Sequence, residues 1–303
     1  LRTIIMIHLG EVIMKILAFF ILISVVASCS TQSTSKSTLE QKKAELFYNQ
    51  GTKHLVEKKY SKALESLMKA HKLDPKKVKI INNLAMSYYF KGKMELAKMY
   101  LEKALDLNPK SSDSRNNLAS ILFHLKEYKK SEKQYKIILE DLIYDQQYRT
   151  HYNLGLVYLK QGKRLQAINS IKKASTLKID YCAANHKLGM MYRETLHHTE
   201  ALKWFKKGMM GTCINEPETQ YQAALTLVDL RKFEQAEQAF RSINERFAST
   251  RYSTLATLKL REVYRNIQIG KSDTDPLREK YFGKQNKSKS DRGNEETFKS
   301  PSF

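Results

Sequence analysis

Residues 78–109 read VKIINNLAMSYYFKGKMELAKMYLEKALDLNP. Counted from Val78, small residues stand at positions 8, 20 and 27, a bulky leucine stands at position 24, and a proline stands at position 32. Small side chains let two helices approach closely, where larger ones would hold the axes apart. Proline lacks the N–H that helix continuation requires, so Pro109 is predicted to stop the second helix. The segment therefore predicts a pair of closely packed helices.

The same positions recur along the chain. Further copies begin at Ala44, Ser112, Tyr148, Cys182 and Pro217, so that the six starts are spaced by 34, 34, 36, 34 and 35 residues. These residues resemble the tetratricopeptide repeat, a helix–turn–helix unit of that period. The resemblance implies an all-α fold: an α-solenoid of about six antiparallel helix pairs in a right-handed superhelix. Unrelated helical hairpins would not keep one register over six copies.

One further helical pattern follows the last repeat. It runs from Arg251 to Ile269, has no partner helix, and is predicted to cap the solenoid before Gly270 ends it. We assign residues 40–269 to the repeat domain with this capping helix. Residues 270–303 lose all periodicity and are rich in Lys, Ser and Asn, so we expect a disordered tail.

The N-terminal segment has the parts of a secretory signal. Met14-Lys15 precedes an uncharged run over residues 16–27, and small residues follow it. The tetrad Val26-Ala27-Ser28-Cys29 resembles the lipobox of bacterial lipoproteins, which implies that Cys29 becomes the lipidated first residue. A transmembrane helix is the alternative, although charges at Glu11 and Lys15 interrupt any longer apolar run.

The segments around Cys29 follow from this interpretation. Residues 1–28 are assigned to upstream sequence and signal peptide. A complete signal peptide begins at Met14, so residues 1–13 are interpreted as upstream sequence. Residues 29–39 form the lipidated Cys and a Ser/Thr-rich tether. Ser30, in the place where an Asp retains lipoproteins in the inner membrane, implies an outer-membrane protein anchored on the periplasmic face.

Composition excludes several classes. Apolar residues make up 42% of the chain, which rules out wholesale disorder, and 5 Pro with 11 Gly argue against a turn-rich all-β protein.

The formal net charge of +22 invites a nucleic-acid interpretation, but no recognition motif supports it. Residues 148–213 hold twelve basic and three acidic side chains. Beside a membrane, such an excess favours contact with anionic lipid, and a solvated helix face is the simpler alternative.

The sequence contains none of the dinucleotide, P-loop, zinc-protease, nucleophile-elbow and C-x-x-C patterns that mark catalytic or cofactor sites. We therefore expect no enzyme activity, no cofactor and no metal. His197-His198 are predicted at the opposite end of the fifth repeat from Cys182 and Cys213, which argues against zinc. The two cysteines fall at the same end of antiparallel helices, so a disulfide is an alternative to two free thiols.

First-helix positions 2, 5, 9 and 12 line the concave face in repeats of this type. Here they are dominated by Tyr, Phe, Met and Leu, which suits an apolar helix or an extended peptide. The alternative is that some of these side chains pack against neighbouring repeats or a seventh helix. The predicted partner-binding groove consists of Tyr48, Asn82, Met86, Tyr89, Asn116, Phe123, Tyr152, Leu156, His186, Met190, Arg193, Tyr221 and Leu225.

The whole arrangement is similar to that of the type IV pilus biogenesis lipoproteins known as pilotins. The likeness rests on the lipoprotein Cys, the polar tether, the six repeats, and the 36-residue step between repeats three and four. It implies a non-enzymatic factor that helps to localise and assemble the pilus secretin, a subunit of which would lie in the groove. Another periplasmic scaffold, for β-barrel insertion or for peptidoglycan hydrolases, is the alternative. The oligomeric state stays open.

Overall fold

The computed structural model describes residues 38–273, and within this range the chain is helical with short connections and no strand. The predicted all-α class, with stacked helix pairs of the tetratricopeptide type, is confirmed there. The chain divides into two compact units, which we call unit 1 (Leu1–Lys163) and unit 2 (Arg164–Phe303). The predicted signal, Cys29 and most of the tether and tail lie outside the described residues.

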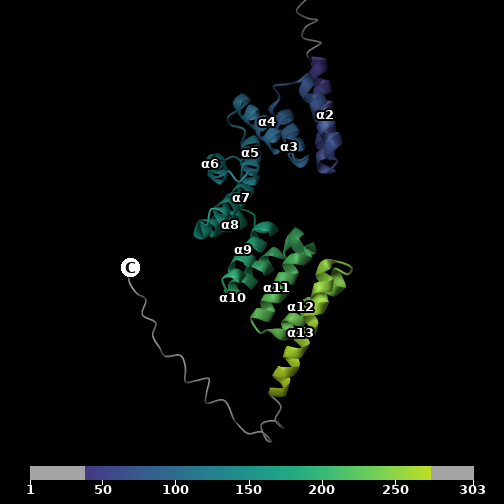
Figure 1. Cartoon of the computed structure of the whole chain (residues 1–303), viewed down its shortest axis with the longest axis vertical. Helices are drawn as coiled ribbons and strands as arrows, with labels where there is room; N and C mark the ends of the chain where they lie inside the picture. The colour runs from purple at the N-terminus through teal and green to yellow at the C-terminus, as the bar shows by residue number, and fades with distance from the viewer. Residues whose placement is uncertain (1–37, 274–303) are drawn as a thin grey trace, which may run out of the picture. The chain divides into compact units, whose positions relative to one another are not determined.

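Unit 1 contains three complete helix pairs and the first helix of a fourth (Figure 1). The first helix of the first pair covers residues 38–56. This helix includes residues 38 and 39, which the sequence analysis placed in the tether. The helices that follow are α2 (Tyr60–Leu73), α3 (Val78–Phe90), α4 (Met94–Leu107), α5 (Ser112–His124), α6 (Tyr128–Leu139) and α7 (Gln147–Lys160).

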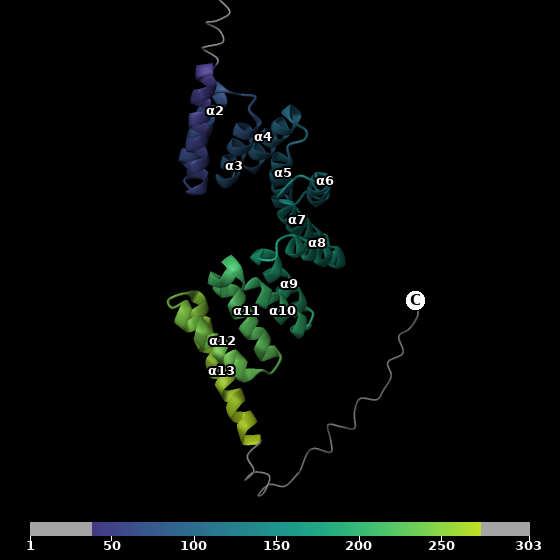
Figure 2. The ribbon, with the colours of Figure 1, turned by 180° about the vertical axis from the view of Figure 1, so that it is seen from behind.

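Unit 2 begins with the second helix of repeat four and ends with the capping helix (Figure 2). The capping helix packs along α12 and also contacts α11. It continues through Gly270 to Asp273, so the predicted stop at Gly270 is wrong. A single glycine lowers helix stability by about 1 kcal/mol but does not by itself turn the chain. The elements are α8 (Arg164–Leu177), α9 (Cys182–Glu194), α10 (His198–Gly208), η1 (Gly211–Asn215), α11 (Pro217–Asp229), α12 (Phe233–Arg246) and α13 (Arg251–Asp273).

Close approach of the two helices in a pair explains the small residues of the repeat. A Cβ added at Gly51 would lie 2.5 Å from Cγ of Leu67, and one added at Gly189 would lie 2.5 Å from the ring of Phe205. Both pairs join repeat positions 8 and 24. The alanines at position 20, Ala63 among them, have no exposed surface. Position 8 is therefore small because the side chain at position 24 occupies its space.

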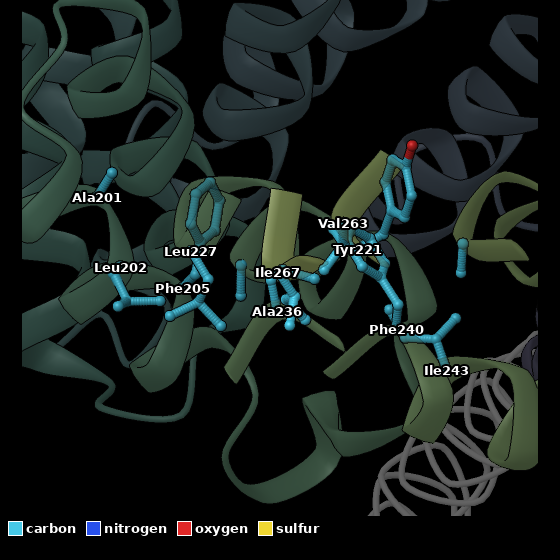
Figure 3. Close-up of a cluster of buried hydrophobic side chains, with 13 residues drawn as sticks. Ala201, Leu202, Phe205, Tyr221, Leu227, Ala236, Phe240, Ile243, Val263 and Ile267 are labelled. Atoms are coloured by element: carbon cyan, nitrogen blue, oxygen red, sulfur yellow. The ribbon is translucent and has the colours of Figure 1, made fainter. Parts of the chain in front are cut away.

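The core of unit 2 extends from repeat five into the capping helix. Phe205, Phe240, Val263 and Ile267 belong to one buried cluster, in which the last two residues come from α13 (Figure 3). The helix therefore closes the apolar face that repeat six would otherwise leave in water, as a terminal repeat requires.

The turn inside every pair has the same backbone geometry. Position 15 of each repeat has a positive φ, between 55° and 76°, a conformation that L-residues disfavour. Glycine supplies it in repeats two and four, at Gly92 and Gly162. In the other four repeats the position is held by Lys58, Lys126, Leu196 and Arg231.

Candidate protein-binding surface

The first helices of consecutive repeats are neighbours within each unit. In unit 1, α3 contacts α5 and α5 contacts α7, and in unit 2, α9 contacts α11. Each unit therefore has its own first-helix face, and the predicted groove residues are described separately for the two faces.

A chain of carboxamides joins the first helices of repeats one to three. Asn83 Nδ2 donates to Thr52 Oγ1 at 2.9 Å, and Asn82 Nδ2 donates to Asn83 Oδ1 at 3.2 Å. From repeat three, Asn117 Nδ2 donates to Asn82 Oδ1 at 3.0 Å. All four side chains are half-buried. The hydrogen bonds run from helix to helix across the face, so they hold polar groups in place along it.

The carboxamides have hydrogen-bonding capacity left over. A primary amide has two N–H donors and an oxygen with two lone pairs, and the bonds above use only part of this set. Asn116 Oδ1, next to the chain, is buried and has no partner within the described residues. Buried polar atoms in native proteins are nearly always satisfied, and an ordered water is the simplest partner for this one.

Aromatic and charged side chains extend the face of unit 1. Lys79 Nζ lies 2.6 Å from Glu45 Oε1 and 4.6 Å from the ring centre of Tyr48. Tyr89 Oη lies 2.9 Å from Nε2 of His124, and burial raises the pKa of Tyr89. Lys79 therefore has both a carboxylate and an aromatic ring as partners, and Tyr89 is held by a hydrogen bond to His124.

The other groove residues predicted in unit 1 are more deeply set. Met86, Phe123 and Leu156 are half-buried, and burial raises the pKa of Tyr152. These side chains lie between the open face and the core, so they are only partly accessible.

In unit 2 the predicted residues form a different arrangement. His186 Nδ1 lies 2.9 Å from Thr219 Oγ1, and burial lowers the pKa of the imidazole, which favours its neutral form. Arg193 Nε donates to Asp229 Oδ2 at 2.7 Å. A hollow of about 230 Å³ lies here, lined by Met190, Arg193, Glu194, Leu196, His198 and Asp229.

Tyr221 does not lie on an open face, so its prediction as a groove residue is wrong. Its side chain is 8% exposed, and its ring packs 5.8 Å from Phe240 and 5.7 Å from Tyr252 of the capping helix. Leu225 and Met190 are half-buried and pack against the same cluster. The alternative expectation, that a seventh helix covers some of these side chains, applies to Tyr221, because α13 lies against α11.

The two cysteines of repeat five are joined. The structure records a disulfide between Cys182 and Cys213, whose Cα atoms are 5.5 Å apart. The sequence left open a disulfide or two free thiols, and the structure has the disulfide. It ties the start of α9 to the 3-10 helix after α10. Within residues 38–273, no three His, Cys, Asp or Glu side chains converge as metal ligands would.

Several basic side chains of repeats four and five already have partners. Lys163 pairs with Glu132 at 3.1 Å in unit 1. In unit 2, Arg164 pairs with Glu194 at 3.4 Å, and Lys207 lies over the ring of Trp204. The basic excess is therefore partly neutralised locally. Among the described helices, none combines the length and apolarity needed to span a bilayer.

Sequence reasoning named Asn82 and Asn116 but missed Asn83 and Asn117. The missed pair stands at position 6 of repeats two and three, and Asn49 and Asn153 occupy the same position in repeats one and four. An amide that recurs at one position of four consecutive repeats was the available signal. Position 6 lies outside positions 2, 5, 9 and 12, which define the predicted groove.

Comparison with known proteins supports the repeat. Models of the tetratricopeptide repeat match residues 78–111, 100–133 and 148–178. A search of curated protein sequences gave no significant match. The chain therefore carries tetratricopeptide repeats. These matches do not show which kind of tetratricopeptide-repeat protein it is.

Solved structures resemble this chain in fold. PilF of Pseudomonas aeruginosa aligns with a TM-score of 0.61 and 17% identity, over 73% of this chain and 99% of PilF. PilW, a widely conserved type IV pilus biogenesis factor, aligns with a TM-score of 0.62 and 18% identity, over 71% of this chain and 98% of PilW. The Cut9–Hcn1 assembly of the APC/C aligns with a TM-score of 0.58 and 18% identity, over 76% of this chain and 46% of that chain. At such identities the likeness establishes the fold alone.

Proposed function

Since this chain is built from tetratricopeptide repeats, we propose that it is a non-enzymatic scaffold that holds a protein partner on the first-helix face of unit 1. The observation that carries the proposal is the row of half-buried carboxamides, whose hydrogen-bonding capacity is only partly used within the chain. An extended peptide presents N–H and C=O groups at regular intervals, which amide side chains can match. Tyr48, Tyr89 and Phe123 beside the row supply apolar contact for its side chains.

We propose further that the partner is a subunit of the type IV pilus secretin, so that the protein acts as a pilotin. Support comes from the 36-residue step between repeats three and four, from the lipobox ending at Cys29, and from the likeness in fold to PilF and PilW. A lipid on Cys29 would hold the scaffold on the periplasmic face of the outer membrane, where the secretin must assemble. Lysines of repeats four and five would add contact with anionic head groups.

Deletion of the gene tests the pilotin role. We expect secretin subunits to remain monomeric, or to form multimers in the wrong membrane, because the escort is missing. The measurement is the yield of heat-stable secretin multimers in separated inner and outer membranes. Normal multimers in the outer membrane of the deletion strain would contradict the pilotin role while leaving a different protein partner open.

The lipid anchor has its own test. Cys29→Ala should release the folded protein from membranes, because the acyl chains can no longer be attached. Membrane fractionation with a circular dichroism spectrum of the purified variant measures both points. Unchanged fractionation would contradict lipidation at Cys29 and would favour the alternative transmembrane anchor.

A further inference from the structure

Two neighbouring aliphatic side chains stand almost fully in water between α6 and α7. Leu142 is 88% exposed and Ile143 is 93% exposed. Both belong to the longer connection at residues 140–146, which we call the acidic loop because it also contains Glu140, Asp141 and Asp145. Three acidic residues in seven are unusual in a chain whose net charge is +22.

Hydrogen bonds hold this loop in one shape. Asp141 Oδ2 accepts from Ser112 Oγ at 2.6 Å, and Asp141 Oδ1 accepts from the Ile143 N–H at 3.3 Å. Gln147 Nε2 donates to the Asp141 carbonyl oxygen at 2.7 Å, and Tyr144 Oη donates to Asp113 at 3.2 Å. The aliphatic pair is therefore presented outward by an ordered loop. Two adjacent aliphatic side chains held outward on an ordered loop are available for contact with a complementary surface.

A hollow with the opposite charge lies on the same unit. It has a volume of about 550 Å³, and we call it the lysine hollow. The rings of Tyr60 and Phe90 stack in its wall, with centres 4.7 Å apart and planes at 11°. The residues that line it are Lys58, Lys59, Tyr60, Ser61, Lys62, Phe90 and Lys91.

The charges of the lysine hollow are only partly neutralised. Lys59 Nζ pairs with Glu57 at 2.8 Å, and Lys91 Nζ donates to Ser61 Oγ at 3.1 Å, which leaves the charge of Lys91 unbalanced. Lys58 and Lys62 add two more exposed cations. The hollow thus offers an aromatic wall with a cationic rim. Its complement is an apolar tip with an anionic rim, which is the composition of the acidic loop.

We propose that the acidic loop of one copy of this chain docks into the lysine hollow of another. Leu142 and Ile143 would cover the stacked rings of Tyr60 and Phe90, while Glu140 and Asp145 face the lysines. This contact is separate from the carboxamide row on the first helices, and it needs neither the lipid nor the pilus partner.

Geometry assigns the contact to two molecules. The hollow is built at the turns inside repeats one and two, whereas the loop connects repeat three to repeat four. Because the helices of a pair are antiparallel, these turns and connections lie at opposite edges of the helix layer. A chain therefore cannot close the contact on itself. Two different surfaces meet, so the association is heterologous, and each pair leaves one loop and one hollow free.

The contact area is small, since one loop enters one hollow. Interfaces that bury less than about 1,200 Å² in total belong to the transient class. The exposed charges also make the association sensitive to salt, because 0.1 M salt screens charges beyond about 10 Å. We therefore expect weak, salt-sensitive self-association that becomes stronger when copies are concentrated on one surface.

The test is co-capture of two differently tagged full-length chains in mild detergent at low salt. The loop variant is Leu142→Ser with Ile143→Ser, and the hollow variant is Lys62→Glu with Lys91→Glu. Wild type should capture wild type. Neither variant should capture itself above background, whereas the loop variant should still capture the hollow variant, because that pair retains one intact loop and one intact hollow.

Matched controls remove the simpler explanations. Leu165→Ser with Ile179→Ser replaces two exposed aliphatic residues of unit 2, and Lys173→Glu with Lys203→Glu changes the same charge at exposed positions. Both controls should capture themselves as wild type does. Retained capture within the mixed pair also excludes misfolding of either variant. Failure of each variant to capture itself excludes association through a shared micelle.

Four results would overturn the proposal. Wild type that captures no wild type shows that the copies do not associate. Capture that persists for both variants with themselves shows that another surface is used. Loss of capture in the mixed pair shows that the loop and the hollow do not face each other, and a loop variant that loses only secretin capture would assign the loop to that partner.

Discussion

The first-helix faces of the two units are built on the same repeat and carry different chemistry. In unit 1 the helices are joined by amides, with Asn117 donating to Asn82 at 3.0 Å. In unit 2 the joining contacts are His186 with Thr219 at 2.9 Å and Arg193 with Gln222 at 3.1 Å, and the capping helix covers Tyr221. Contacts at positions 8 and 24 inside the pairs are alike in both units, at Gly51–Leu67 and Gly189–Phe205. The interior of a pair is thus constrained by packing, while its first-helix face is free to vary.

The largest expected effect comes from opening the interior of unit 2. Phe240 has no exposed surface, so Phe240→Ala leaves a cavity and should lower the free energy of unfolding of unit 2 by about 3–5 kcal/mol. Trp204, the only tryptophan, lies in α10 of the same unit, and its fluorescence during urea unfolding gives the measurement.

The control is Leu165→Ala in α8, whose side chain is 72% exposed. It should move the Trp204 transition by less than about 0.5 kcal/mol. Equal effects of the two substitutions would show that the cluster around Phe240 does not support unit 2.

The disulfide distinguishes the two units more specifically. Reduction of Cys182–Cys213 opens a loop of 31 residues, and the chain-entropy estimate for that length is about 3–4 kcal/mol. The Trp204 transition should move to lower urea on reduction. A substitution in a turn of unit 1, Lys126→Gly, provides the control. Its effect on the free energy of unfolding of unit 1 should be the same with and without reductant.

Thiol counting checks the bridge itself. Under denaturing, non-reducing conditions Cys182 and Cys213 should not react. If both react, and if reductant leaves the Trp204 transition unchanged, the comparison between the units loses its covalent element.

The repeat framework could be predicted from sequence because packing constrains it at fixed intervals. Position 8 must be small where position 24 is a leucine or a phenylalanine, and Gly51 and Gly189 obey this rule. The faces could not be predicted equally well. Tyr221 stands at the same repeat position as Asn82, but only the structure reveals that α13 covers it. The capping helix also continues past Gly270, because a single glycine lowers helix stability without ending the helix by itself.

The amide row gives the sharpest test of the proposed binding face. Asn83→Ala with Asn117→Ala removes donors in repeats two and three, so capture of the secretin subunit should fall several-fold. Each lost hydrogen bond costs about 0.5–1.5 kcal/mol of stability, so the variant should remain folded. A binding titration together with thermal unfolding of the variant separates the two effects.

Asn169→Ala is the matched control, because this exposed amide lies on the second helix of a pair. It should bind the subunit as wild type does. If the double variant also binds normally, the row is structural and the partner lies elsewhere.

The smallest effect is expected at the turns, where the two units should behave alike. Lys126 in unit 1 and Arg231 in unit 2 have φ values of 64° and 55°, at the repeat position where Gly92 and Gly162 stand. A non-glycine residue pays about 1–2 kcal/mol for that conformation, and glycine loses part of this gain through greater freedom in the unfolded chain. Lys126→Gly and Arg231→Gly should therefore each stabilise their unit by about 0.5–1 kcal/mol.

Urea unfolding followed by circular dichroism measures the effect of Lys126→Gly, and Trp204 fluorescence measures the effect of Arg231→Gly. Lys133→Gly, in the interior of helix α6, should destabilise unit 1 by about 1 kcal/mol instead, because glycine there has no strain to relieve. A gain at Lys126 with a loss at Arg231 would show that the turns of the two units differ as their faces do.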